Sequence, residues 1–146
     1  MGSLRRSARQ KRRGVALVEF AMCVSLLFLF MFAMIEFSRV LQIQHVVRQA
    51  AFEGARTAAT LDATTATVQA QITKVLSAGS LVNPGTPIIT DGNGGALTYS
   101  STRATVTISV DPAGNSWMMN YVMPGHPITA TITLDREVQA VSVPGP

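Results

Sequence analysis

The sequence has few of the residues from which enzyme sites, disulfides and charged surfaces are made. It holds one cysteine and two histidines in 146 residues, and 14% of its residues are charged, against about a quarter in soluble globular proteins. The single cysteine, Cys23, excludes an intramolecular disulfide. Cys23 lies in an apolar run, where a thiol usually serves as a small hydrophobic side chain. The low charge indicates that part of the chain is a membrane segment.

The motifs of the common catalytic and metal-binding classes are also missing. The sequence contains no CxxC, HExxH, P-loop or GxSxG pattern. His45 and His126 are the two histidines of the sequence, and neither lies in a metal-binding motif. The loop at residues 91–95 lacks the spaced third ligand and the closing glutamate of an EF-hand. We therefore predict no enzyme activity, no catalytic residue, no cofactor and no metal site, and we interpret residues 91–95 as a turn.

The positive charge of the chain is concentrated at its N-terminus. Six basic residues and no acidic one precede Gly14, whereas six basic and eight acidic residues follow it, a balance of −2. A basic cluster of this kind can bind nucleic acid, but here an apolar run follows it at once. A basic segment beside a membrane is the better interpretation, and we expect no nucleic acid partner.

Residues 15–35 form an apolar run of 21 residues with one charge, Glu19. As a helix they would reach about 31 Å, close to the thickness of the hydrocarbon core of a bilayer. Twelve of them are Leu, Ile, Val or Phe. These favour insertion by roughly 4 to 7 kcal/mol. Glu19, near the helix end, costs about 3 kcal/mol or less, so insertion remains favourable. A secretory signal is disfavoured because the run is too long and no small-x-small cleavage site follows it. The sequence predicts one membrane span, with the basic leader in the cytoplasm and the rest outside it.

The junction between leader and span has a distinctive order of residues. Gly14 separates the two, Val15 opens the apolar run, and Glu19 and Phe20 follow. This junction resembles the processing site of type IVb prepilins and pseudopilins of the Tad (Flp) system. The resemblance implies that a prepilin peptidase cuts after Gly14, so that Val15 becomes the first residue and Glu19 the fifth. It also implies that Glu19 pairs with the new amine of a neighbouring subunit, which offsets part of the cost of burying a charge.

The resemblance continues beyond the span. Glu-Phe-Ser-Arg at residues 36–39 and an alanine-rich stretch at residues 47–59 containing Glu-Gly-Ala-Arg are similar to the TadE-like family over about residues 13–60. This implies a minor pseudopilin of a Tad pilus or a related secretion machine in a bacterial inner membrane, with its head on the periplasmic side. The implied partners are the membrane, the prepilin peptidase, other pilin or pseudopilin subunits and the Tad assembly platform.

The membrane helix is expected to continue outside the bilayer. Apolar residues at helical spacing extend the pattern to about Thr60, on a face made of Phe37, Val40, Leu41, Val47, Ala51, Ala55 and Ala58. A second helix is predicted from a cap at Asp62 to Gly79. Its apolar stripe is Val68, Ile72, Val75 and Leu76.

Strands are expected in the remainder of the chain. Residues 103–110 and 128–134 alternate apolar and polar side chains, as half-buried strands do. Residues 87–90 and 137–143 are weaker candidates. Antiparallel strands with one wet face can cover a helix, so the predicted class is α+β, with a long N-terminal transmembrane helix and a small antiparallel-sheet head. The expected parts are a leader at 1–14, a transmembrane helix at 15–35, a helix continuation at 36–60 and a head at 61–143.

Two points stay open from the residues alone. The chain could be an uncleaved single-pass membrane protein whose outer domain binds a partner. The apolar stretch at residues 117–123 could be core, which we favour, or a surface that contacts another subunit.

Overall fold

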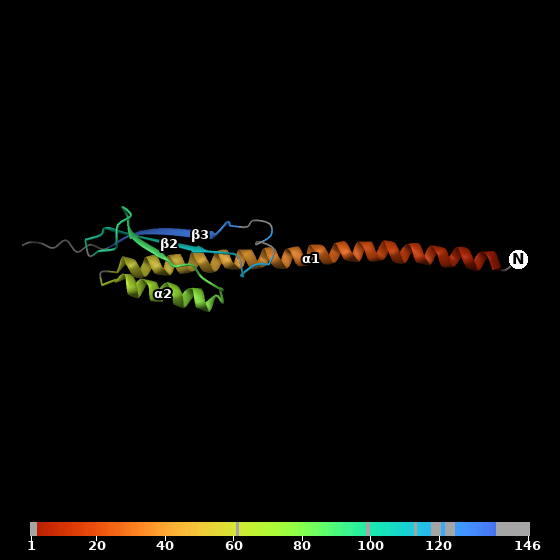
Figure 1. Cartoon of the computed structure of the whole chain (residues 1–146), viewed down its shortest axis with the longest axis horizontal. Coiled ribbons are helices and arrows are strands. Elements are labelled where there is room, and N and C mark those ends of the chain that lie inside the picture. The colour runs from red at the N-terminus through yellow and green to blue at the C-terminus, as the bar shows by residue number, and fades with distance from the viewer. Residues whose placement is uncertain are drawn as a thin grey trace, which may run out of the picture. The chain divides into compact units, whose positions relative to one another are not determined.

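The structure, a computed structural model, has two helices followed by three strands (Figure 1). It describes residues 3–60, 62–98, 100–112, 114–117, 121 and 125–136, with side chains from Gly14 onward. The elements are α1 (Ser3–Ala59), α2 (Thr65–Ala78), β1 (Ile88–Asp91), β2 (Arg103–Val110) and β3 (Ile128–Asp135). The chain divides into two compact units, Met1–Ser38 and Arg39–Pro146. We call the second unit the head. The α+β prediction is confirmed.

Helix α1 begins at Ser3, twelve residues before the expected start at Val15. The leader is rich in Arg, Lys, Gln and Ala, which are among the better helix-forming residues, so the helix of the span extends back through it. At the other end α1 stops at Ala59, and the backbone amide of Thr60 donates to the carbonyl of Thr57 at 3.2 Å. Residues 39–59 of α1 belong to the head.

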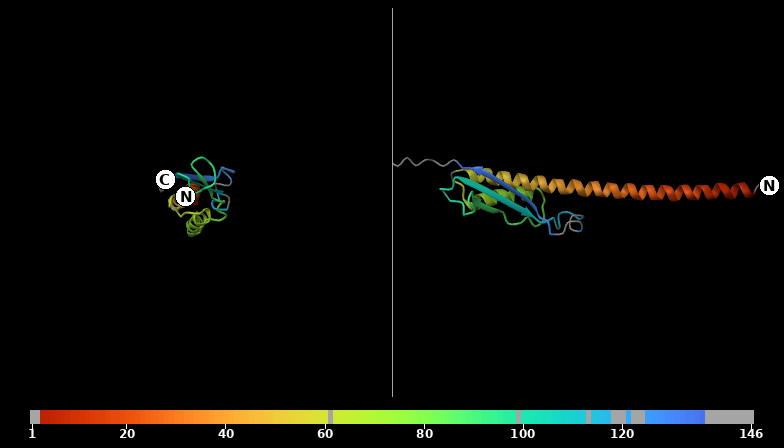
Figure 2. Two further views of the ribbon diagram at one scale, coloured as in Figure 1. Left: turned by 90° about the vertical axis from the view of Figure 1, so that its left-hand side faces the viewer. Right: turned by 90° about the horizontal axis from the view of Figure 1, so that it is seen from above.

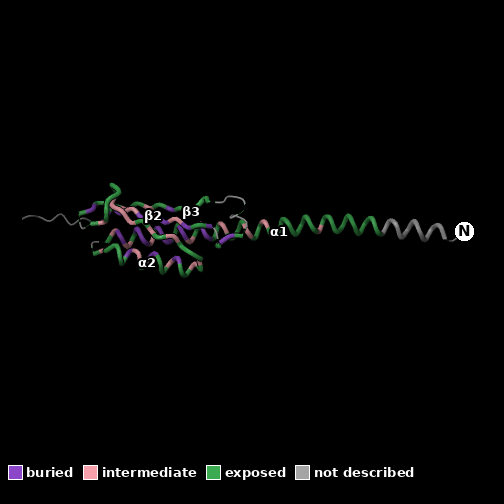
Figure 3. Tube along the Cα trace, viewed as in Figure 1, coloured by how far each residue is buried: buried purple, intermediate pink, exposed green. Residues whose placement is uncertain are grey.

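The core of the head is built on the small-residue face of α1, against α2 and β2 (Figure 3). Gly54 of α1 lies at a close approach of three elements, because a Cβ there would lie 2.5 Å from Cγ1 of Ile72 in α2 and 3.4 Å from Cγ1 of Val106 in β2. The absence of a side chain at Gly54 lets three elements meet. The buried apolar residues are Ile43, Val47, Ala50, Ala51, Ala55, Ala58, Val68, Ile72, Leu76, Ala104, Val106, Ile108, Val110 and Ala130.

The predicted apolar face of α1 is right in its second half and wrong in its first. Val47, Ala51, Ala55 and Ala58 are fully buried, whereas Phe37 is 66% exposed and Leu41 is also exposed. Phe37 lies before the head and Leu41 at its start, where the described residues put no other element over this side of the helix, whereas Val40 is half-buried. Ile43 and Ala50, which the predicted face omitted, complete the buried stripe.

The N-cap of α2 lies two residues later than predicted. Thr64, not Asp62, is the N-cap: its hydroxyl accepts from the amide of Thr67 at 3.2 Å, and the Thr67 hydroxyl accepts from the amide of Thr64 at 3.1 Å. This reciprocal pair is a capping box made by two threonines. Gly79 ends the helix as predicted, and Val68, Ile72 and Leu76 are its buried residues.

The three strands form one antiparallel sheet in the order β1-β2-β3, and β2 and β3 lie side by side in Figure 2. Alternate residues of β2 are buried, as the sequence pattern predicts. On the outer face, hydroxyls pair across the strands, Thr105 with Thr133 at 2.9 Å and Thr107 with Thr131 at 3.0 Å. The expected strand at residues 137–143 lies outside the described residues.

Candidate membrane span and processing site

The N-terminal unit exposes nearly all of its apolar side chains. Part of α1 is long and apolar enough to cross a membrane, and none of that stretch is buried within the chain. A helix that is apolar all round is stable in lipid or inside a large core, and the described residues supply no core here. The exposed large apolar residues of this unit are Val15, Leu17, Val18, Phe20, Met22, Leu26, Leu27, Phe28, Leu29, Phe30, Met31, Phe32, Met34, Ile35 and Phe37.

Gly14 lies within α1, not in a loop at its start. It is exposed, and a Cβ added to it would meet no atom within 4 Å. Packing therefore does not require glycine at this position. A glycine inside a helix costs about 1 kcal/mol relative to alanine, so Gly14 weakens the helix locally at the junction between leader and span. A protease that needs an extended substrate would find the helix easier to unwind here.

Val15, Glu19 and Phe20 lie on the first turns of the span. Val15 and Glu19 are four residues apart, so they occupy one face of α1, one turn from each other. Val15 is 60% and Phe20 66% exposed. The Glu19 carboxylate makes no hydrogen bond or ion pair with any residue whose side chain the structure describes. It is the sole charge in residues 15–35, and in a membrane it would be costly without a partner.

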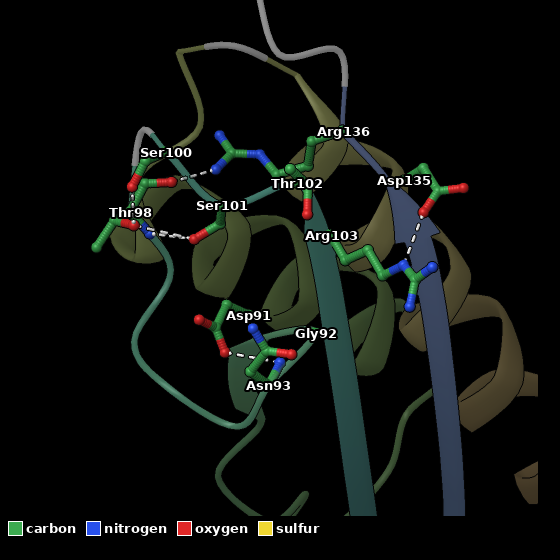
Figure 4. A pocket seen from close by; sticks show the side chains of 10 residues that line it. All are labelled: Asp91, Gly92, Asn93, Thr98, Ser100, Ser101, Thr102, Arg103, Asp135 and Arg136. Atoms are coloured by element: carbon green, nitrogen blue, oxygen red, sulfur yellow. Dashed lines mark hydrogen bonds and ion pairs between the residues drawn. The ribbon is translucent and has the colours of Figure 1, made fainter.

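The head contains a polar pocket of about 530 Å³ beside the ends of β1, β2 and β3 (Figure 4). Arg136 lies in its wall and is 8% exposed. Its Nη1 donates to the carbonyl of Thr98 at 2.6 Å and its Nη2 to the carbonyl of Thr60 at 3.1 Å. Arg136 therefore ties the end of α1 to the loop before β2, which is a structural role.

The acidic residues of this pocket are also used structurally. Asp135 pairs with Nε of Arg103 at 3.1 Å on the exposed face of the sheet. One oxygen of Asp91 accepts from the amides of Asn93 at 3.0 Å and Gly95 at 2.6 Å, which closes the predicted turn, and Gly94 adopts a φ of +88°. Across the described part of the chain, no cluster of His, Cys, Asp and Glu could hold a metal ion.

Two aromatic residues of the β2–β3 loop contradict the favoured prediction of a core. Trp117 is 73% and Tyr121 78% exposed, and their rings meet edge to face with centroids 6.2 Å apart. Among the loop residues that the structure describes, the buried ones are polar or small, namely Pro112, Asn115 and Ser116. Sequence reasoning also missed Asn115 and Arg136, because a lone polar residue in a loop carries no periodic signal of burial.

Comparison with known families adds one finding to this geometry. Residues 14–56 match the family described as TadE-like protein. Comparisons with curated proteins and with solved structures gave no match. The matched segment begins at the junction glycine, contains the exposed apolar span and ends inside the head, three residues before the end of α1. The chain thus carries a TadE-like N-terminal segment.

Proposed function

We propose that this protein is a membrane-anchored, minor pseudopilin-like subunit of a Tad (Flp, type IVb) pilus or a related secretion machine. The observation that carries the proposal is the exposed apolar stretch of α1, with Glu19 five residues beyond Gly14, inside the TadE-like segment. Its role is structural, in assembling or priming a pilus, rather than enzymatic.

The proposed location is a bacterial inner membrane, which α1 crosses once. The six basic residues of the leader favour a cytoplasmic N-terminus. The head, with its own hydrophobic core, then folds on the periplasmic side. The subunit could then leave the membrane and be incorporated in an extracellular pilus.

In the proposed maturation a prepilin peptidase cleaves after Gly14 and releases the leader. The mature chain starts at Val15 and loses six positive charges. Glu19, which has no described partner within its own chain, then pairs with the Val15 amine of a neighbouring subunit. An ion pair formed in lipid offsets part of the desolvation cost of both charges, so it would favour one register between subunits. Partners include other pilin or pseudopilin subunits and the Tad assembly platform.

Intact mass and N-terminal sequencing of the protein from its native host test this proposal. We expect Val15 as the first residue. Replacing Gly14 with leucine should block cleavage, because a bulky side chain opposes entry into the protease cleft, while flotation with membranes stays unchanged. A wild-type chain that still starts at Met1 would refute the processing step.

The second candidate is an uncleaved single-pass membrane protein with an outer binding domain. The continuity of α1 through Gly14 favours it, since the peptidase would have to unwind this helix to reach its site. The same mass measurement separates the candidates, because this one keeps the leader and still floats with membranes.

A further inference from the structure

The β2–β3 loop presents two amphipathic aromatic side chains to the surroundings. Trp117 and Tyr121 are each more than 70% exposed and contact each other. Between Asp111 and the start of β3, residues 112–127 contain no Lys, Arg, Asp or Glu. A soluble surface loop of this length is usually polar and charged, so an uncharged loop that exposes its aromatic residues calls for a partner of its own.

The base of the loop is fixed by hydrogen bonds. The side chain of Asn115 accepts from the amide of Val82 at 2.7 Å and donates to the carbonyls of Val82 at 2.7 Å and Asp111 at 3.1 Å. Asn115 and Ser116 are buried, and both of their amides donate to the carbonyl of Pro112 at 3.0 Å. Trp117 is therefore exposed directly after a buried turn that hydrogen bonds hold in place.

The loop lies at the end of the head where α1 enters it. A pocket of about 260 Å³ is lined by Gln44, Val47 and Arg48 of α1 and by residues 126–130, which connect the loop to β3. Val110 and Ile128, the strand residues that flank the loop, pair with each other at this end of the sheet. Gln44 is nine residues from Ile35, the last residue of the proposed span. Nine residues span about 14 Å as a helix and at most about 32 Å when extended, so this end of the head is tethered close to the bilayer.

We propose that Trp117 and Tyr121 insert into the headgroup region of the outer leaflet and dock the head on the membrane. Trp and Tyr favour this interface because each has an apolar ring and one polar group that remains hydrated. The absence of charge in the loop removes the main cost of entering it. The proposal rests on the membrane span proposed above. The short tether and the lack of charge favour lipid over a protein partner.

The fluorescence of Trp117 can report this contact, because Trp117 is the sole tryptophan of the chain. Full-length protein is reconstituted in phosphatidylcholine vesicles with brominated or ordinary acyl chains, and Trp117 emission is compared. We expect brominated lipid to remove about half or more of the emission, since an indole at the interface contacts the upper acyl chains. Unchanged emission overturns the proposal. If Trp117 is then also shielded from acrylamide, a protein surface such as a second copy covers it.

A relocated reporter provides the matched control. Asn93 is exposed in the turn after β1, at the opposite end of the sheet. The double variant Trp117→Phe, Asn93→Trp should keep its emission in brominated vesicles, and equal quenching at both positions would contradict docking through the loop.

Vesicle flotation tests the membrane span separately from the docking of the head. A chain that floats with unquenched Trp117 refutes only the docking, whereas a chain that does not float refutes the span and the docking with it.

Discussion

Arg136 is a charged residue buried in a small head, and its partners explain how it can be there. Two of its nitrogens donate to backbone carbonyls, those of Thr98 and Thr60. Thr60 directly follows α1, whose last carbonyls have no partner within the helix and carry partial negative charge. The Thr60 carbonyl accepts from the amide of Ala63 at 3.3 Å, and the guanidinium adds a second, charged donor that is stabilised by the negative end of the helix. A side chain far along the sequence thus completes the end of α1.

Replacing Arg136 with methionine should destabilise the head by about 2 to 4 kcal/mol, because two hydrogen bonds from a charged group are lost, although each carbonyl keeps one backbone amide donor. Urea unfolding of the full chain in detergent, followed by circular dichroism, measures the change. Arg103→Met is the matched control. Its ion pair with Asp135 is largely exposed, so its removal should cost less than about 1 kcal/mol. Equal losses would refute the capping role.

At the scale of elements, sequence periodicity predicted much of this fold. Strand β2 matches its predicted bounds, β3 extends one residue further, and β1 is shifted by one residue. These predictions succeeded because side chains on a half-buried strand must alternate. Helix ends were less predictable. Asp62 and Thr64 are both acceptable caps by residue type, and the structure uses Thr64, whose hydroxyl and amide bond reciprocally with Thr67.

The same physics explains which parts of the candidate site were predictable. The span and its junction are local patterns, so the apolar run could be predicted, and Gly14 and Glu19 proposed as site residues, without a fold. The exposure of Trp117 and the burial of Asn115 depend on contacts 33 residues away, between Asn115 and Val82. No local pattern encodes such a contact, and the prediction of a core at residues 117–123 failed at Trp117 and Tyr121 for this reason.

The packing of α1 on α2 predicts that replacing glycine with alanine has opposite effects on stability at Gly54 and at Gly14. Gly54→Ala should destabilise the head by about 1 to 3 kcal/mol despite the better helix propensity of alanine, because the new methyl group meets Ile72. Gly14→Ala should leave the stability of the head unchanged and strengthen α1 locally by about 1 kcal/mol. Thermal unfolding of both variants checks this. A Gly54→Ala head as stable as the wild type would show that α2 can move away.

At the scale of the whole molecule, the chain has two units with different environments. The N-terminal unit exposes apolar residues on all sides, whereas the head buries a core of its own. The outer face of the sheet pairs hydroxyls between β2 and β3 and needs no cover. Among the described residues, the span with Glu19 and the loop with Trp117 are the surfaces for which we propose partners.

Glu19→Ala separates membrane insertion from assembly. Removing the charge should leave insertion unchanged or improve it by up to about 3 kcal/mol, as measured by membrane flotation. Assembly with other subunits should fall, because the pairing with the Val15 amine is lost, and crosslinking in the native host measures it. Glu19→Asp is the control, since it keeps the charge. Normal pilus assembly by Glu19→Ala would refute the pairing role.

The position of Gly14 also bears on the order of events in biogenesis. Among the residues that the structure describes, those of the hydrophobic core all lie at Ile43 or beyond, and the surroundings of Gly14 are open. Loss of the leader would therefore leave the free energy of unfolding of the head unchanged, and precursor and mature chain should melt at the same temperature. Maturation of the N-terminus and folding of the head are then thermodynamically independent. The order in which the two occur would then leave the stability of the mature head unchanged.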